Sequence, residues 1–310
     1  MIEVSGLSKS YQNIRAVEDV SFSVERGEIV GFLGPNGAGK TTTMRILTGA
    51  IPADRGTAVV AGFDIFEQPM EVKRRIGYLP ENPPLYMDLT VLDYLDFTAS
   101  LKGLKGVSKS REVHLAMGKC NISDVQGRLI GNLSKGYKQR VGIAQAILGS
   151  PEVLILDEPT IGLDPNQIHE VRTLIKALAK ERTVILSTHI LPEVEMTCQK
   201  VVVIHKGRIV ATDTIDGIVK GRSGGRQVYV RVKNDSSGAA QKVRSSLLLE
   251  TEPGHEPDSF MVIMNPDEDR RDELAKLIVD GGHGLIELKA RELSLEDVFR
   301  QLTTDETRAA

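Results

Sequence analysis

The octet Gly34-Pro35-Asn36-Gly37-Ala38-Gly39-Lys40-Thr41 matches the pattern G-x-x-x-x-G-K-[ST]. It follows the apolar run Ile29–Leu33, which predicts a strand, and it precedes Thr42–Leu47, whose spacing predicts a helix. In this arrangement the glycines let backbone N–H groups converge on phosphate oxygens at the N-terminus of the helix, where the partial positive charge favours an anion. The octet therefore predicts a bound nucleoside triphosphate, with Lys40 reaching the β- and γ-phosphates and Thr41 ligating magnesium. A chance Gly-rich turn is the alternative, and the full octet in this context disfavours it.

Length, charge and cysteine content bound the class of protein. The chain has 310 residues, with 39 Lys and Arg against 42 Asp and Glu and a net charge of −3. No run of 18 apolar residues is present, and the balanced charge argues against a basic nucleic-acid binder. Residues 1–6 lack the organisation of a signal peptide, and the two cysteines, Cys120 and Cys198, lie far apart. We therefore expect a reduced, cytosolic protein.

Two acidic residues, Asp157 and Glu158, directly follow the apolar run Val153–Leu156, which predicts a buried strand. At the carboxyl end of a parallel strand, which opens onto a ligand crevice, the two acids would have different tasks. Asp157 would hold the hydration shell of magnesium, and Glu158 would orient or deprotonate the attacking water. Two acids after a strand more often form a solvated loop or a helix cap. The phosphate loop upstream favours the catalytic interpretation.

The order of apolar runs predicts the domain organisation. Continuous apolar strands that alternate with helical stretches indicate an α/β domain with a parallel sheet. Residues 81–133 indicate a helical insertion, with helices over Thr90–Lys102 and Ser108–Lys119. The Gly-, Ser- and Arg-rich stretch Gly217–Gly225 predicts a linker and a domain boundary. Beyond it, the order βα(β)βαβ predicts a small ferredoxin-like unit. Residues 221–310 carry 13 Lys and Arg and 17 Asp and Glu, so this unit is not expected to bind nucleic acid.

Five motifs in their order along the chain resemble the nucleotide-binding domain of ATP-binding cassette (ABC) ATPases. They are the phosphate loop, Leu133-Ser134-Lys135-Gly136-Tyr137-Lys138-Gln139-Arg140, the Asp157-Glu158 strand end, Gly162-Leu163-Asp164, and His189 after a strand. The resemblance covers roughly residues 1–215. It implies an α/β P-loop NTPase fold with a parallel core sheet, an antiparallel β subdomain and a helical subdomain at about 82–150. We expect this ABC domain to span residues 1–220, and residues 221–310 to form an accessory α+β, ferredoxin-like domain.

The resemblance also implies a role for individual residues in ATP binding. Tyr11 would stack on adenine, although a strand aromatic can simply pack locally. Ser134 and Gly136 would reach the γ-phosphate of ATP bound to the opposite subunit, although Ser134 taken alone is more readily explained as a helix N-cap. Asp164 would lie at the turn of the dimer interface. The expected ATP-binding set is Tyr11, Gly34, Pro35, Asn36, Gly37, Ala38, Gly39, Lys40, Thr41, Thr42, Ser134, Gly136 and Asp164.

The resemblance completes the catalytic set with His189 and Glu81. His189 would contact the γ-phosphate and orient the chemistry of Glu158, although an isolated histidine is more often a structural hydrogen-bonding group. Glu81, in Tyr78-Leu79-Pro80-Glu81, stands where the family usually has a glutamine that touches magnesium and water. A carboxylate can still accept a hydrogen bond from water or ligate magnesium, but it adds negative charge beside a triphosphate. We expect Glu158, His189 and Glu81 to be catalytic, and Thr41, Asp157 and Glu81 to ligate Mg²⁺.

The last motif, Glu292–Thr303, looks like the closing motif of ATPases from type-2 ABC exporters, including those of gliding motility and of drug or polysaccharide export. It can equally be a capped amphipathic helix, with Ser294 as the cap and the packed face formed by Leu295, Val298, Phe299 and Leu302. Both interpretations can hold at once.

Taken together, the resemblance implies a cytoplasmic ATPase subunit that uses ATP and Mg²⁺. Two copies would sandwich two ATP molecules and drive a separately encoded integral membrane permease, with export favoured and no nucleic acid involved. The subunit would be peripheral, held at the inner face of the cell membrane by the permease. An importer ATPase is the nearest alternative. A soluble ABC protein that acts on ribosomes or DNA is the other, but such proteins usually carry two cassettes or a long coiled-coil insertion, and this sequence has neither.

Overall fold

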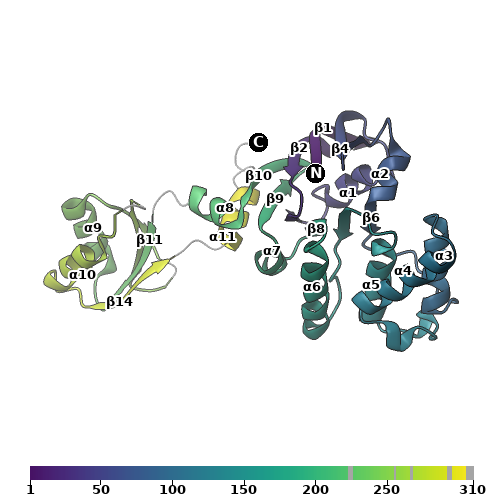
Figure 1. Cartoon of the computed structure of the whole chain (residues 1–310). Coiled ribbons are helices and arrows are strands. Elements are labelled where there is room, and N and C mark those ends of the chain that lie inside the picture. The colour runs from purple at the N-terminus through teal and green to yellow at the C-terminus, as the bar shows by residue number, and fades with distance from the viewer. Residues whose placement is uncertain (223–225, 255, 266–267, 292–294, 305–310) are drawn as a thin grey trace. The chain divides into compact units, whose positions relative to one another are not determined.

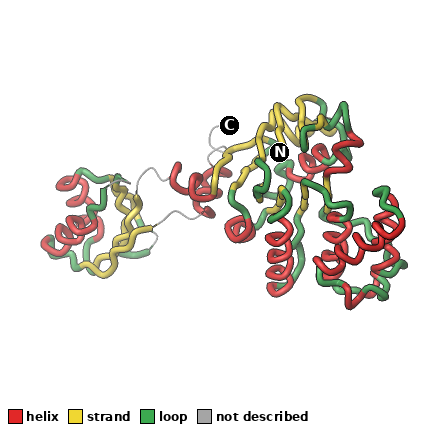
Figure 2. Tube along the Cα trace, in the orientation of Figure 1, coloured by secondary structure: helices red, strands yellow, loops and turns green. Residues whose placement is uncertain are grey.

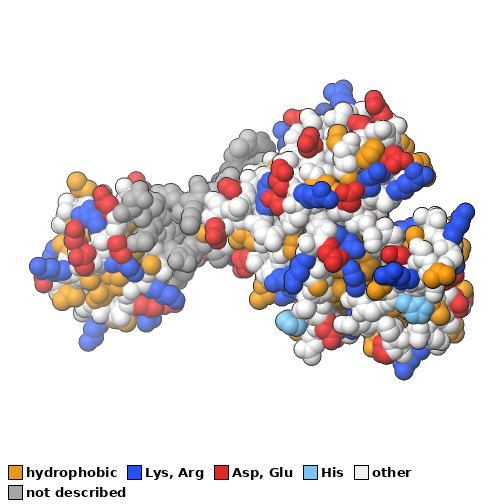
Figure 3. Space-filling model, in the orientation of Figure 1, with side chains coloured by type: hydrophobic (Ala, Val, Ile, Leu, Met, Phe, Trp, Pro, Cys, Tyr) orange, Lys and Arg blue, Asp and Glu red, His pale blue; other side chains and the backbone are white. Residues whose placement is uncertain are grey.

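The structure is a computed structural model, and it describes all of residues 1–310 except 223–225, 255, 266–267, 292–294 and 305–310 (Figure 1). The chain forms two compact units, Met1–Ile215 and Asp216–Ala310. No helix in the described part of the chain has the length and apolar character needed to cross a membrane. Acidic and basic side chains are interspersed on the visible face of the first unit (Figure 3), as its balanced composition leads one to expect.

A six-stranded sheet forms the core of the first unit. Its strand order is β10-β9-β3-β8-β7-β6, and the neighbours from β9 to β6 are parallel. Every residue of β3 and β7 is buried, which explains why these strands are continuous apolar runs. The parallel α/β core is therefore confirmed. The bounds are β3 Ile29–Leu33, β6 Ile76–Leu79, β7 Val153–Asp157, β8 Thr183–Thr188, β9 Lys200–His205 and β10 Arg208–Thr214, and the helices among them are α1 Lys40–Leu47, α6 Pro165–Ala179 and α7 Leu191–Thr197.

A separate four-stranded antiparallel sheet has the order β2-β1-β4-β5. Figure 2 shows strands, in yellow, beside the N-terminus, where this sheet begins. The antiparallel sheet shares one hydrophobic core with the parallel sheet, because the rings of Phe22 and Phe32 lie 5.4 Å apart between their centroids. The antiparallel β subdomain is thus confirmed, and β1 carries Tyr11 at its end. The bounds are β1 Ile2–Tyr11, β2 Ile14–Val24, β4 Arg55–Val60, β5 Phe63–Asp64 and α2 Pro69–Arg75.

The helical subdomain consists of α3 (Val91–Leu101), α4 (Gly106–Lys119) and α5 (Lys135–Ile147), with two short 3₁₀ turns between α4 and α5. Thr90 caps α3, because its hydroxyl accepts a hydrogen bond from the backbone N–H of Asp93 at 3.2 Å. The helices predicted over Thr90–Lys102 and Ser108–Lys119 correspond to α3 and α4, which begin within two residues of the predicted starts. The helical insertion is confirmed, and α5 connects it to the parallel sheet through contacts with β6.

The second unit contains the predicted ferredoxin-like arrangement. Its four-stranded sheet has the order β12-β13-β11-β14 with every neighbouring pair antiparallel, and two helices pack on one face. Alternate strand residues such as Val228, Val230 and Val262 form the core with Leu274 and Ile278. The bounds are β11 Arg226–Val232, α9 Ser236–Leu247, β12 Glu250–Pro253, β13 Ser259–Met264, α10 Arg271–Asp280 and β14 Leu285–Arg291.

Helix α11 (Leu295–Thr304) follows β14 and has the amphipathic character expected from its sequence. Leu295, Val298 and Leu302 are buried, and they recur at the helical spacing of one face. Ser294, the expected cap, lies outside the described residues. The first residue of the closing motif that the structure describes is therefore Leu295.

The predicted linker over Gly217–Gly225 is wrong for its first six residues, because helix α8 spans Ile215–Arg222. Ile218 is buried three residues after Ile215, so the segment presents an apolar face that a linker would lack. Asp216 in the first turn favours the helix further, because its charge complements the helix dipole. The remaining positions, 223–225, lie outside the described residues.

Candidate nucleotide site

The Gly34–Thr41 loop joins β3 to α1, which confirms the predicted strand, loop and helix. Two of its glycines are required by their neighbours. A Cβ atom at Gly34 would lie 2.3 Å from the carbonyl oxygen of Ile204, and one at Gly39 would lie 2.4 Å from the carbonyl oxygen of Ala16. Gly39 also has φ of 107°, which a residue with a side chain rarely adopts. The loop can therefore pack this tightly against neighbouring backbone only with glycine at both positions.

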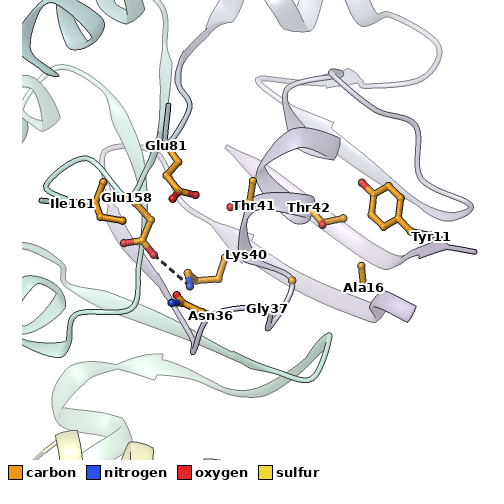
Figure 4. Close-up of a pocket in the computed structure, with 11 residues that line it drawn as sticks. Tyr11, Ala16, Asn36, Gly37, Lys40, Thr41, Thr42, Glu81, Glu158 and Ile161 are labelled. Atoms are coloured by element: carbon orange, nitrogen blue, oxygen red, sulfur yellow. Dashed lines mark ion pairs between the residues drawn. The ribbon is translucent and has the colours of Figure 1, made fainter. Parts of the chain in front are cut away.

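A cavity of about 400 Å³ opens over this loop (Figure 4). Its size lies within the range of ordinary ligand pockets. Figure 4 places Tyr11 at one end and Glu158 at the other, with Lys40, Thr41 and Glu81 between them. The lining residues are Tyr11, Ala16, Asn36, Gly37, Gly39, Lys40, Thr41, Thr42, Glu81, Glu158 and Ile161. Most of the residues expected to bind ATP or act in catalysis thus line one cavity, although Ala16 and Ile161 were not foreseen.

The Lys40 ammonium group is buried in the cavity floor and is fully partnered by the chain itself. Its Nζ donates to the carbonyl oxygens of Gly34 at 2.9 Å and Pro35 at 3.3 Å. It also lies 3.3 Å from Oε1 of Glu158, and each of these two side chains is only 6% exposed. The cation that would face the phosphates is therefore paired with the acid that would activate water, a contact the sequence did not indicate.

Neighbouring strands bring Glu158 and His189 together. Residue Asp157 of β7 pairs with Ser187 of β8, and the backbone N–H of Glu158 donates to the carbonyl of Ser187 at 2.9 Å. Nδ1 of His189 then lies 2.9 Å from both carboxylate oxygens of Glu158. Because an ionised carboxylate only accepts hydrogen bonds, we assign the proton of the histidine to Nδ1. Nε2 can then donate to a phosphate only when the ring is protonated.

The Asp157 side chain is fully buried, and only one of its two carboxylate oxygens accepts a hydrogen bond from the described part of the chain. Its Oδ1 accepts a hydrogen bond from the Ser187 hydroxyl at 2.7 Å, whereas Oδ2 has no hydrogen-bond partner among the described residues. Burial raises the pKa of Asp157, the hydroxyls of Ser187 and Thr41 lower it, and the negative charges of Glu158 and Glu81 raise it. An unpartnered buried carboxylate oxygen beside a hydroxyl suits a bound cation.

No group of three His, Cys, Asp or Glu side chains that could hold a metal exists within the described residues. A magnesium ion held by Thr41, Asp157 and Glu81 would therefore need phosphate or water oxygens to complete its octahedral coordination, as Mg²⁺ at triphosphates usually does. The donor set fits a metal ion that arrives with the nucleotide.

Ser134, Gly136 and Asp164 do not line this cavity. Ser134 caps α5 by accepting from the N–H of Tyr137 at 3.4 Å, and Asp164 caps α6 by accepting from the N–H of Gln167 at 2.9 Å. A Cβ atom at Gly136 would lie 2.7 Å from Cδ of Gln167, so the two helix starts lie close together. The structural explanation of Ser134 holds within one chain, and the three residues form a second cluster apart from the cavity.

Sequence reasoning missed the acid Glu193 on α7. Its side chain is 1% exposed, and its carboxylate accepts hydrogen bonds from the hydroxyls of Thr160 and Thr188. Thr160 lies two residues after Glu158, and Thr188 directly precedes His189. A possible signal in the sequence is the position of this acid, four residues beyond His189 in the first turn of a helix.

One relative and two solved structures similar to this chain are all ATP-binding proteins or components of transporters. Residues 17–161 match the family model described as "ABC transporter". The bacitracin transport ATP-binding protein BcrA of Bacillus licheniformis is 36% identical over 304 residues, which are 97% of each chain. A solved structure described as the ATP-binding subunit of an ABC transporter is 35% identical, with a TM-score of 0.65 over 71% of this chain and 92% of that one. The structure of CbiO1 from Clostridium perfringens, part of the ABC transporter complex CbiONQ, is 27% identical, with a TM-score of 0.64 over 80% of this chain and 95% of that one.

Proposed function

Because this chain belongs to the family of ABC transporter ATP-binding proteins, and so binds and hydrolyses ATP, we propose that two copies join head to tail around two ATP molecules and drive a separate membrane permease. The observation that supports the dimer is that the residues expected to contact ATP fall into two separate clusters within one chain. Ser134, Gly136 and Asp164 lie outside the cavity that contains Lys40 and Glu158. A second copy can bring its Ser134 cluster over that cavity, so each ATP would be held by both chains.

We propose that the permease belongs to the type-2 class and that transport runs in the direction of export. BcrA, which is named for bacitracin transport, matches this chain over 97% of its length, so the likeness includes the C-terminal unit. A drug-like compound is therefore the substrate class we favour over a nutrient. CbiO1, in turn, is described as part of a transporter complex. The permease would hold the ATPase at the inner face of the cell membrane.

Co-purification tests this proposal most directly. The tagged chain, carrying Glu158→Gln to hold ATP, is expressed with a neighbouring reading frame that encodes about six apolar segments of ~20 residues each. We expect an integral membrane protein to co-purify in detergent in stoichiometric amount. A preparation in which the membrane protein is expressed without the tagged chain controls for its nonspecific retention during purification. Recovery of ribosomes or DNA in place of a membrane protein would contradict the transporter proposal.

We propose the following division of work in the site. Lys40 and the loop N–H groups bind the phosphates, and Tyr11 stacks on adenine at the far end of the cavity. Glu158 accepts the proton of the attacking water, and His189 orients that carboxylate from 2.9 Å away. A magnesium ion between Thr41, Asp157 and Glu81 would supply positive charge for the phosphate oxygens.

We expect Glu81 to do the work of the glutamine that the family usually has at this position, which touches magnesium and water. Glu81→Gln keeps an acceptor oxygen in the cavity and should retain ATPase activity within about threefold, whereas Glu81→Ala removes the acceptor and should lower magnesium-dependent turnover by about tenfold or more. The measurement is steady-state ATP hydrolysis against Mg²⁺ concentration, with and without the permease. If Glu81→Ala matches the unmodified chain under every condition, Glu81 is only a loop acid.

We propose that residues 221–310 are an accessory unit, because every residue that lines the cavity precedes residue 162. A chain that ends at Arg222, the last residue of α8, should bind ATP with the affinity of the full chain. Binding of a fluorescent ATP analogue to the monodisperse truncated protein measures this. A folded truncated chain that has lost ATP binding would show that the division is wrong.

A further inference from the structure

Glu193 connects the two loops that carry the reacting side chains. Its carboxylate accepts hydrogen bonds from Thr160, in the loop after β7, and from Thr188 at the end of β8, the latter at 2.8 Å. The three side chains are at most 3% exposed. The acid therefore ties helix α7 to both loops, in an environment where water cannot replace a lost hydrogen bond.

Each threonine is closely coupled to a site residue. Thr160 belongs to the turn in which the N–H of Ile161 donates to the carbonyl of Glu158 at 3.2 Å. The Thr188 hydroxyl, besides donating to Glu193, accepts from the N–H of Ile190 at 3.1 Å, which fixes the backbone on both sides of His189. A shift of either hydroxyl would therefore move Glu158 or His189.

We propose that Glu193 is a positioning residue for ATP hydrolysis, which holds the Glu158 carboxylate and the His189 ring in contact. Glu193 is 1% exposed and does not line the cavity, so its effect on ATP hydrolysis would pass through the two loops that it joins. The inference rests on the proposed roles of Glu158 and His189. A misplacement of about 1 Å can lower a rate by ~10²-fold, so a small shift of these loops is enough to slow turnover.

The test compares Glu193→Gln with Glu195→Gln, which removes the same charge from an exposed position on the same helix. An amide offers only one acceptor oxygen where two hydroxyls now donate. We expect kcat of Glu193→Gln to fall by roughly 10- to 100-fold, while the Kd for a fluorescent ATP analogue stays within twofold. Glu195→Gln should match the unmodified chain in both. Measurements are made well below the melting temperature of each variant.

Thr160 supplies a second test that does not depend on folding of the Glu193 variant. Thr160→Ser keeps the hydroxyl and should retain kcat, whereas Thr160→Val keeps the shape, loses the donor and should lower kcat with unchanged ATP affinity. Equal kcat for Thr160→Ser and Thr160→Val, or a parallel loss of kcat and affinity in Glu193→Gln, would overturn the proposal. Glu158→Gln is measured alongside. Full activity in Glu158→Gln would refute the proposed role of Glu158. The kcat and Kd of Glu193→Gln would still show whether Glu193 affects turnover separately from ATP binding.

Discussion

Glu158→Gln should stop ATP turnover while leaving ATP bound. The amide has nearly the same shape as the carboxylate but cannot take a proton from water, so we expect kcat to fall by about 10²–10⁴-fold, the usual contribution of a general base. ATP affinity should be equal or higher, because Lys40 no longer has a carboxylate 3.3 Å away to compete with the phosphates. Steady-state hydrolysis and equilibrium binding measure the two effects separately.

The same variant should accumulate an ATP-held dimer, because hydrolysis would no longer release the two chains. Size-exclusion chromatography with light scattering, in the presence of ATP and Mg²⁺, should show twice the monomer mass. Glu195→Gln, an exposed acid changed in the same way, serves as the control and should turn over ATP normally. A variant that binds ATP and remains monomeric at every concentration would contradict the head-to-tail dimer.

Lys40→Ala should abolish useful nucleotide binding. Truncating one partner of a desolvated charge pair costs about 2–5 kcal/mol of binding free energy, which corresponds to an increase in Kd of roughly 30- to 5000-fold. The chain contains no tryptophan, so Tyr11→Trp supplies a single fluorescent reporter at the adenine end of the cavity. In that background ATP should change the emission strongly, and addition of Lys40→Ala should remove the response.

A loss of folding has to be separated from a loss of binding in this variant. Lys40→Ala leaves the buried Glu158 carboxylate without its ammonium partner, so thermal stability should also fall. Lys40→Ala combined with Glu158→Gln also removes the carboxylate that has lost its ammonium partner, and the stability of the double variant should recover. ATP affinity of the double variant should nevertheless stay low. If the double variant binds ATP as tightly as Glu158→Gln alone, Lys40 does not contact the phosphates.

The sequence predicted the elements of the fold well where a local pattern decides them. Continuous apolar runs such as Val153–Leu156 had to be buried strands, because no other environment accepts them. The predicted order βα(β)βαβ was sufficient for the ferredoxin-like arrangement, since few topologies connect such elements without crossing, although no residues were assigned in advance to the bracketed strand, which is β12. The linker prediction failed over Gly217–Arg222 because two glycines outweighed one buried isoleucine, Ile218, whose burial depends on tertiary packing.

The sequence by itself determined the phosphate loop, because its function depends on consecutive residues: glycines that bring backbone N–H groups together, followed by Lys40 and Thr41. It also determined the chemical type of the Asp157-Glu158 pair. The tertiary structure alone decided which of these groups meet. The parallel register of β7 and β8 places His189 beside Glu158, and burial sets Glu193 between Thr160 and Thr188. Thr160 and Glu193 lie 33 positions apart in the chain, and Glu158 and His189 lie 31 apart. Strand pairing and desolvation bring such distant residues together, and neither leaves a periodic pattern in the sequence.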